Sequence, residues 1–96
     1  MTLEEFNSSL NDAGPPEESG SLLKAMWWDK KGNWEGAHNL AQEIETKDGA
    51  WVHAYLHRKE GDVGNASYWY SKAGRKIFHG SSDLEWEEII KALIQY

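Results

Sequence analysis

Apolar residues recur at helical spacing near the N-terminus. Leu3, Phe6 and Leu10 are separated by three and four residues, so a helix would place all three on one side. Thr2 and Glu5 have the spacing of a capping box, in which each side chain bonds the other residue's backbone N–H. The pattern predicts a short first helix.

The last part of the chain has a longer periodic pattern. Ser82 and Glu85 again have the spacing of a capping box. The apolar residues that follow are spaced at i, i+3, i+4, i+7 and i+8, namely Trp86, Ile89, Ile90, Leu93 and Ile94. This pattern predicts a final helix with one strongly apolar face.

The middle of the chain resembles itself at an offset of 29 residues. Segment 20–33 aligns with segment 49–62, and segment 37–44 aligns with segment 66–73. The matches fall mostly on glycines and small residues, and Asn33 and Asp62 occupy equivalent positions as N-caps after a glycine. Each unit is therefore predicted to be a helix, a turn containing glycine and a second helix.

Two tandem helical hairpins with a helix at each end predict an all-α fold of six helices, built as a short solenoid array. Trp51–Leu56 has strand propensity, but the repeat aligns it with Leu22–Trp27 and favours a helix. Residues 1–19 are predicted to form an N-terminal capping helix followed by an arm that contains proline and glycine. Residues 20–96 are predicted to form the repeat domain and its C-terminal capping helix.

One segment of the second unit resembles a known repeat family. Gly61-Asp62 followed by Ala66-x-x-Trp69-Tyr70-x-Lys72-Ala73 is similar to the second helix of tetratricopeptide-like repeats, including their Sel-type variants. The resemblance implies an all-α solenoid that binds proteins or peptides. The first unit, residues 32–44, lacks the Trp-Tyr pair, and the 29-residue offset is shorter than the usual repeat of that family.

A second resemblance covers residues 53–69, which contain the pattern H-x3-H-R-x-E-G-D-x2-N-x3-W. This segment is similar to a group of small uncharacterised bacterial and fungal proteins. The resemblance implies no particular activity, because none is established for that group.

The strongest candidate for chemistry is a polar stripe on the helix that opens the second unit. His53, His57 and Glu60 fall within about 60° of one another on a helix. The equivalent positions in the first unit are Lys24, Trp28 and Lys31. Because two of those three positions are charged, the stripe is predicted to be accessible or to line a groove.

This stripe can be interpreted in three ways. Two histidines four residues apart and a carboxylate can present three ligands to Zn²⁺ or a similar divalent ion, although a further ligand such as His38 or His79 cannot be placed from sequence. Alternatively, the stripe is a hydrogen-bonded helix surface in which Glu60 pairs with His57, or a groove that binds a ligand without metal. The sequence favours these two interpretations over metal binding. A general acid/base role for His53, His57 and Glu60 has less support, because no nucleophile motif accompanies them.

Two further residues are candidates for partner binding. Trp28 lies on the stripe equivalent to the histidines and is the best candidate for an exposed anchor. Arg58 is expected to pair with an acid of the same chain, and its alternatives are stacking on a ring or contact with a ligand carboxylate. The other tryptophans on apolar faces are predicted to lie in the core: Trp27, Trp51, Trp69 and Trp86.

Composition narrows the classes of partner. The chain has 16 acidic and 10 basic residues, a net charge of −6 and no cysteine. Without a basic patch, binding to nucleic acid or to a membrane surface is not expected, and thiolate chemistry is excluded. The acidic N-terminus and the lack of an apolar run of about 18 residues predict a cytoplasmic protein.

The sequence as a whole favours a module that binds a protein or peptide through Trp28, His53, His57, Arg58 and Glu60. The alternative is a small metal- or ligand-dependent enzyme that uses the His53, His57 and Glu60 face. A third interpretation is an accessory protein whose aromatic residues seal a homodimer.

Overall fold

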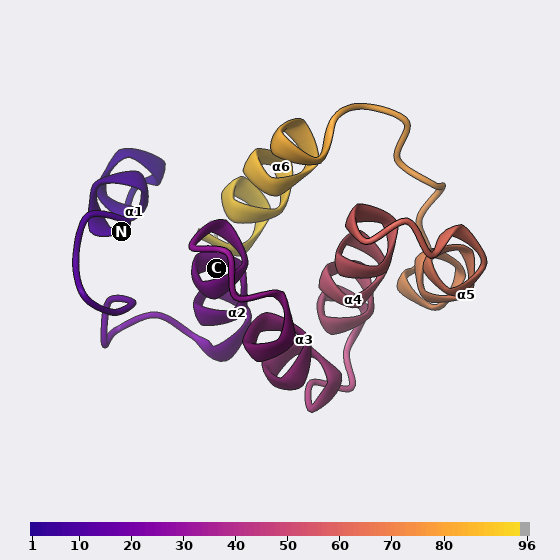
Figure 1. Cartoon of the computed structure of the whole chain (residues 1–96), viewed down its shortest axis with the longest axis horizontal. Helices are drawn as coiled ribbons and strands as arrows, with labels where there is room; N and C mark the ends of the chain where they lie inside the picture. Colours follow the sequence, from indigo (N-terminus) through magenta and orange to yellow (C-terminus); the bar gives the residue numbers. More distant parts are fainter. Residues whose placement is uncertain (95–96) are drawn as a thin grey trace.

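The computed structural model describes residues 1–94 and contains six helices in that range, with no strand among them (Figure 1). The predicted all-α class is therefore confirmed, and residues 51–56 are helical. The last two residues of the predicted 20–96 domain lie outside the described range. The helices are α1 (Leu3–Ser9), α2 (Ser21–Lys30), α3 (Trp34–Gln42), α4 (Lys47–Lys59), α5 (Val63–Ala73) and α6 (Ser82–Ile94). None of them is both long enough and apolar enough to cross a membrane.

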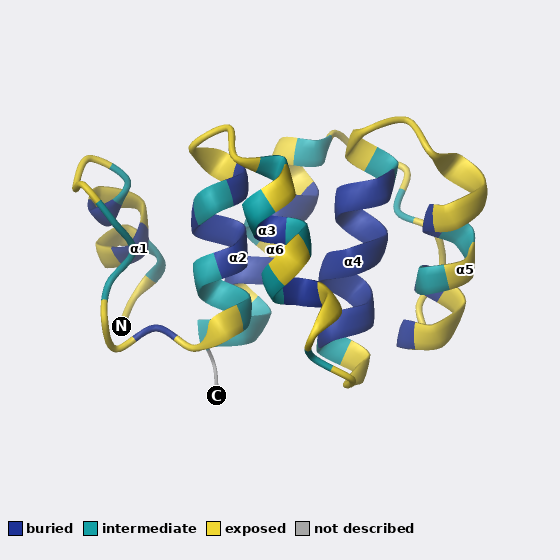
Figure 2. Ribbon diagram, turned by 60° about the horizontal axis from the view of Figure 1, so that its bottom comes forward, coloured by how far each residue is buried: buried dark blue, intermediate teal, exposed yellow. Residues whose placement is uncertain are grey.

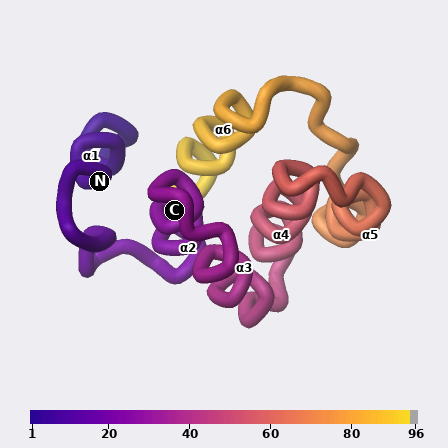
Figure 3. Tube along the Cα trace, viewed as in Figure 1, coloured from indigo at the N-terminus to yellow at the C-terminus, as the bar shows by residue number. Residues whose placement is uncertain are grey.

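Helix α4 is the centre of the molecule. Every residue from Gly49 to His57 is buried, and Figure 2 shows this helix as one continuous buried segment. No charged residue occurs between these two positions, so all sides of the helix can pack against other elements. Helices α2, α3, α5 and α6 all contact α4, and Figure 3 shows α3 and α5 on opposite sides of it.

The two glycine turns of the predicted repeat have the same geometry. Gly32 and Gly61 have φ angles of 91° and 92°, which lie in the region that favours glycine. The next residue in each turn is an N-cap: Asn33 accepts a bond from the backbone N–H of residue 36, and Asp62 accepts one from that of Asn65. Both predicted N-caps are confirmed, whereas stacking of the hairpins as a solenoid array stays a prediction.

The helix starts show where the sequence patterns succeed and fail. The Thr2–Glu5 capping box is present, with bonds of 2.9 and 3.1 Å. The predicted box at Ser82 is wrong, because Ser81 caps α6 by accepting a 3.1 Å bond from the backbone N–H of residue 84. Glu85 therefore takes no part in a capping box, and its side chain is fully buried.

Glu85 is the centre of a buried polar network between three helices. Its carboxylate accepts hydrogen bonds from the Tyr70 hydroxyl at 2.6 and 2.7 Å and from the Trp51 indole N–H at 3.1 Å. It also accepts a 3.1 Å bond from Nε of Arg58, whose Nη2 lies 3.0 Å from the same oxygen. A buried carboxylate requires such partners, because an unpaired charge in the interior is strongly destabilising.

A second buried carboxylate joins α2 to α4. Asp29 accepts a 2.5 Å hydrogen bond from the Tyr55 hydroxyl and a 3.0 Å ion-pair bond from Nζ of Lys59. Burial raises the pKa of the Tyr55 phenol, and the bond to Asp29 raises it further. The phenol therefore remains protonated and continues to donate.

Tryptophan N–H groups connect the helices as well as filling the core. Trp27 and Trp86 donate to backbone oxygens of Ser9 and Met26, which connects α2 to α1 and α6 to α2. Trp27, Trp51 and Trp86 are buried as predicted, whereas Trp69 is only partly buried. A buried indole N–H needs an acceptor, so these bonds restrict how the helices can pack.

Candidate metal centre

Three histidine side chains lie close together where α3 packs against α4. His38 lies on α3, and His53 and His57 lie one turn apart on α4. Each residue contributes one ring nitrogen, and these three nitrogens all lie within 4.8 Å of one another. The closest pair consists of Nε2 of His38 and Nε2 of His53, which are 2.9 Å apart. We name these three residues the histidine cluster.

The position of His38 depends on the packing of α3 against α4. Trp34, Ala37, His38 and Ala41 follow the i, i+3, i+4, i+7 spacing of one helix face, and both alanines are buried. This spacing was the signal in the sequence that could have placed His38 on the face toward α4. From sequence, Glu60 was the third candidate ligand, and His38 was a further candidate ligand without an assigned position.

Two tryptophans hold the imidazole rings from either side. The Trp34 ring stacks on His38 with centroids 4.9 Å apart, and the Trp69 ring stacks on His53 at 3.9 Å. Trp34 is itself fixed by a 2.8 Å bond from its N–H to the backbone oxygen of Leu56. The cluster thus has aromatic walls from α3 and α5.

The histidines are more buried than the sequence analysis predicted. His53 is 6% exposed and His57 is 7% exposed, so the prediction that they are accessible is wrong for both. The alternative prediction, that the stripe lines a groove, holds for His53, which forms part of the wall of a cleft beside Trp69. The histidines are buried because α3 and α5 pack against α4 on either side of the stripe.

Burial also changes the protonation of the cluster. It lowers the pKa of His53 from 6.5 to about 4, and the neighbouring His38 and His57 contribute through charge repulsion. The pKa of His38 is lowered as well, first by burial and then by His57. A neutral imidazole is the form that binds a metal ion. Of His38 and His53, the ring that donates the 2.9 Å bond would have to move its hydrogen to Nδ1 before both Nε2 atoms could bind a metal.

Glu60 contacts the cluster through His57. Its Oε2 lies 2.7 Å from Nδ1 of His57, which confirms the predicted pairing of these residues. With a proton on Nδ1, this contact is a hydrogen bond and Nε2 keeps its lone pair. Metal-binding histidines commonly have such a carboxylate behind them, which fixes the ring and increases its basicity.

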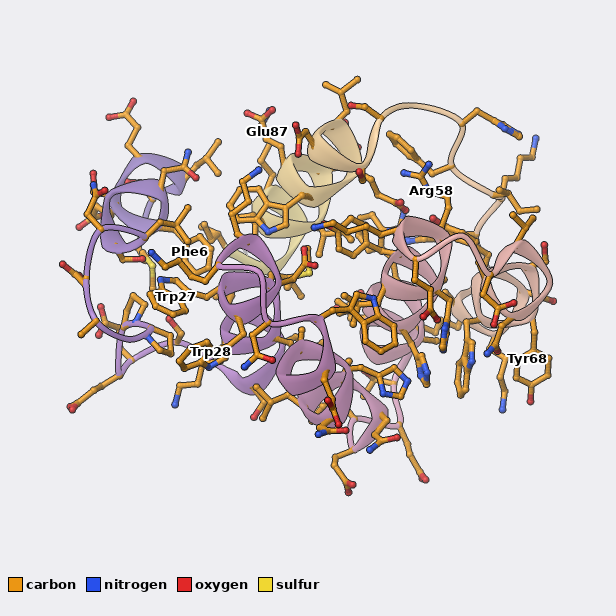
Figure 4. The ribbon with its side chains drawn as sticks, viewed as in Figure 1. Phe6, Trp27, Trp28, Arg58, Tyr68 and Glu87 are labelled. Carbon is orange, nitrogen blue, oxygen red and sulfur yellow. The ribbon has the colours of Figure 1, made fainter. Side chains whose placement is uncertain are left out.

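Arg58 and Trp28 lie apart from this arrangement. The Arg58 guanidinium bonds Glu85 and the backbone oxygen of Gly80, so the expected intramolecular pairing is confirmed. Trp28 is half-buried and packs edge-on against Trp27, at a centroid distance of 4.9 Å. In Figure 4, Trp28 lies on the side of α2 that faces the N-terminal arm, and Arg58 lies on the side of α4 that faces α6. Binding of a protein or peptide through these residues stays a prediction.

The cluster has the donor set of a three-histidine metal site. Ligands about 2.0–2.1 Å from tetrahedral Zn²⁺ lie about 3.3 Å from one another. The Nε2 atoms of His38 and His53 would therefore separate by a few tenths of an ångström from 2.9 Å, and the other pairs of ring nitrogens, which lie within 4.8 Å, would adjust to the same spacing. Comparisons of the chain with protein-family models, with curated proteins and with solved structures find no match.

Proposed function

We propose that this protein binds one divalent transition-metal ion, with Zn²⁺ as the first candidate, through His38, His53 and His57. The observation that carries the proposal is the convergence of three imidazole nitrogens from two helices. Imidazole suits Zn²⁺, Cu²⁺ and Ni²⁺, whereas Mg²⁺ and Ca²⁺ prefer oxygen ligands. Glu60 serves as a positioning residue behind His57.

Two features support a metal site over a purely structural cluster. Two of the three histidines have lowered pKa values, so protons compete less with a metal ion at neutral pH. Each histidine also has a neighbour that fixes its ring: Trp34 for His38, Trp69 for His53 and Glu60 for His57. Fixed ligands lose less conformational freedom on binding, which increases affinity.

Calorimetric titration of metal-free protein without a histidine tag tests the proposal. We expect one Zn²⁺ per chain in wild type and no binding at that site in His38→Gln. His79 is exposed and lies outside the cluster, so His79→Gln is the matched control and should bind as wild type does. Zinc at 100 times its Kd should stabilise the fold by about 2.7 kcal/mol.

The proposal is wrong if wild type takes up no stoichiometric metal. It is also wrong if folded His38→Gln, verified by circular dichroism, binds Zn²⁺ as tightly as His79→Gln does.

A further inference from the structure

A cleft adjoins the histidine cluster where α3, α4 and α5 meet. Its volume is about 490 Å³, within the range of ~300–1,000 Å³ that is typical of sites for small organic ligands. His53 and Trp69 belong both to the wall of this cleft and to the cluster and its aromatic walls. A ligand in the cleft therefore lies next to a proposed metal ligand.

Part of the cleft wall is apolar. Ile44 and Trp69 line it and are only partly buried, so they expose apolar surface, whereas Ala41 and Ala50, which also line it, are almost completely buried. Such a surface suits a short hydrocarbon group, because contact with it removes apolar area from water.

The rim of the cleft is positively charged. Lys47 and Lys72 lie on it, and neither forms an ion pair with another residue in the range 1–94. Nζ of Lys72 lies 5.4 Å from the centroid of the Trp69 ring. One acid, Glu45, shares the rim, so its ionisable residues still favour an anion.

A metal ion in the cluster would add to this attraction. Three neutral imidazoles leave the +2 charge of the ion uncompensated, and a site with three protein ligands keeps one position open for a further ligand. A carboxylate oxygen is a suitable fourth ligand for Zn²⁺. Resting on the metal site proposed above, we infer that the cleft binds a small monocarboxylate. Its carboxylate lies toward the metal and the lysines, and its short hydrocarbon tail lies on Ile44 and Trp69.

Visible absorption of Co²⁺-loaded protein tests this inference, with acetate, butyrate and hexanoate titrated at constant ionic strength. Each carboxylate should change the Co²⁺ spectrum, and affinity should increase about two- to fourfold for each added CH₂ group that enters the apolar part. Butyramide has the same tail without the charge and should leave the spectrum unchanged. Equal affinity for all three carboxylates would show that the cleft is not used.

Charge variants test the rim separately from the metal. Lys47→Gln and Lys72→Gln should each raise the Kd for butyrate about threefold, while the control Lys91→Gln, on α6, should not change it. Co²⁺ affinity, measured without carboxylate, should be the same in all of these proteins. Co²⁺ binding without any response to carboxylate overturns this inference and leaves the metal site standing. Failure to bind either Co²⁺ or Zn²⁺ overturns both, as does binding that persists in His38→Gln.

Discussion

The Nε2 atoms of His38 and His53 lie 2.9 Å apart, although the two residues belong to different helices. At this distance one nitrogen carries a hydrogen and donates a hydrogen bond to the other, so at least one of the two must be unprotonated on that side. A second hydrogen on that side would leave two N–H groups facing each other and a positive charge within a largely buried cluster. The neutral state of this pair is therefore part of what keeps α3 and α4 together.

The metal-free protein should lose stability as the pH falls from about 6.5 toward 4. The pKa of His53 is lowered to about 4 in the folded protein, so the unfolded chain binds more protons in this interval. The stabilising contribution of neutral His53 is thus complete above the unfolded pKa and decreases as the pH approaches the folded one. Urea midpoints measured across this range in wild type and His53→Gln would show the effect.

Carboxylates also titrate in this pH interval. The contribution of His53 is therefore measured as the difference between wild type and His53→Gln. The decrease should be shallower in His53→Gln than in wild type, whereas exposed His79→Gln should follow wild type. If the urea midpoints of wild type and His53→Gln decreased in parallel with pH, the loss of stability could not be assigned to His53.

Removal of the Glu60 carboxylate should weaken metal binding without abolishing it. Glu60→Gln replaces the charged acceptor that holds Nδ1 of His57 at 2.7 Å, while the three proposed ligands remain. Loss of such a partner typically lowers metal affinity about tenfold or more. The Kd for Zn²⁺ should therefore rise about tenfold, as measured by competition with a chelating dye.

Glu17→Gln makes the same change of charge at an exposed position in the loop after α1 and should leave the Kd unchanged. An equal effect in both variants would indicate a general influence of net charge and argue against a contact through His57.

Glu85→Ala should be among the most destabilising single substitutions in the protein. It leaves the partly buried Arg58 guanidinium without its carboxylate and the Tyr70 hydroxyl without its acceptor. Removing one partner of a buried ion pair costs about 3–5 kcal/mol. Chemical unfolding should show this loss, and Glu88→Ala, at an exposed position on the same helix, should change stability by less than about 0.5 kcal/mol. Similar unfolding free energies for the two variants would refute the role of Glu85.

Two glycine substitutions should have effects of opposite sign. Gly61 has a φ of 92°, so Gly61→Ala forces a side chain into the left-handed region and should destabilise by about 1–2 kcal/mol. Gly64 lies in α5, and a Cβ added there would meet no atom within 4 Å. Gly64→Ala should therefore stabilise by up to about 1 kcal/mol, the difference in helix propensity. Thermal unfolding of the two variants measures both effects, and a Gly61→Ala variant as stable as wild type would show that the turn does not require positive φ.

Local spacing was sufficient to predict much of the secondary structure. The N-caps at Asn33 and Asp62 and the pair formed by His57 and Glu60 involve residues three apart, so the sequence alone contains their geometry. The spacing of Ser82 and Glu85 misled the prediction, because Ser81 offers the same hydroxyl one residue earlier. Because Ser81 and not Ser82 caps α6, Glu85 is not part of a capping box and its side chain lies in the core.

Only part of the candidate site could be predicted from sequence, because the rest depends on contacts between helices. His53 and His57 share a helix, but His38 reaches them only through the packing of α3 on α4, which spacing along one helix does not specify. Burial of the cluster likewise depends on Trp69 from α5. The sequence therefore indicated His53, His57 and Glu60 as candidate ligands, while the position of His38 and the aromatic walls required the tertiary structure.

The two buried carboxylates restrict the rotation of α4. Asp29 holds this helix through Tyr55 from the α2 side, and Glu85 holds it through Trp51 from the α6 side. A slip of one residue along α4 would turn it by about 100° and break directional bonds on both sides. The helix that carries His53 and His57 is thus fixed about its axis by contacts within the chain. If the histidine cluster binds a metal ion as proposed, we expect loading and release to require movement of side chains only, without refolding of the helices.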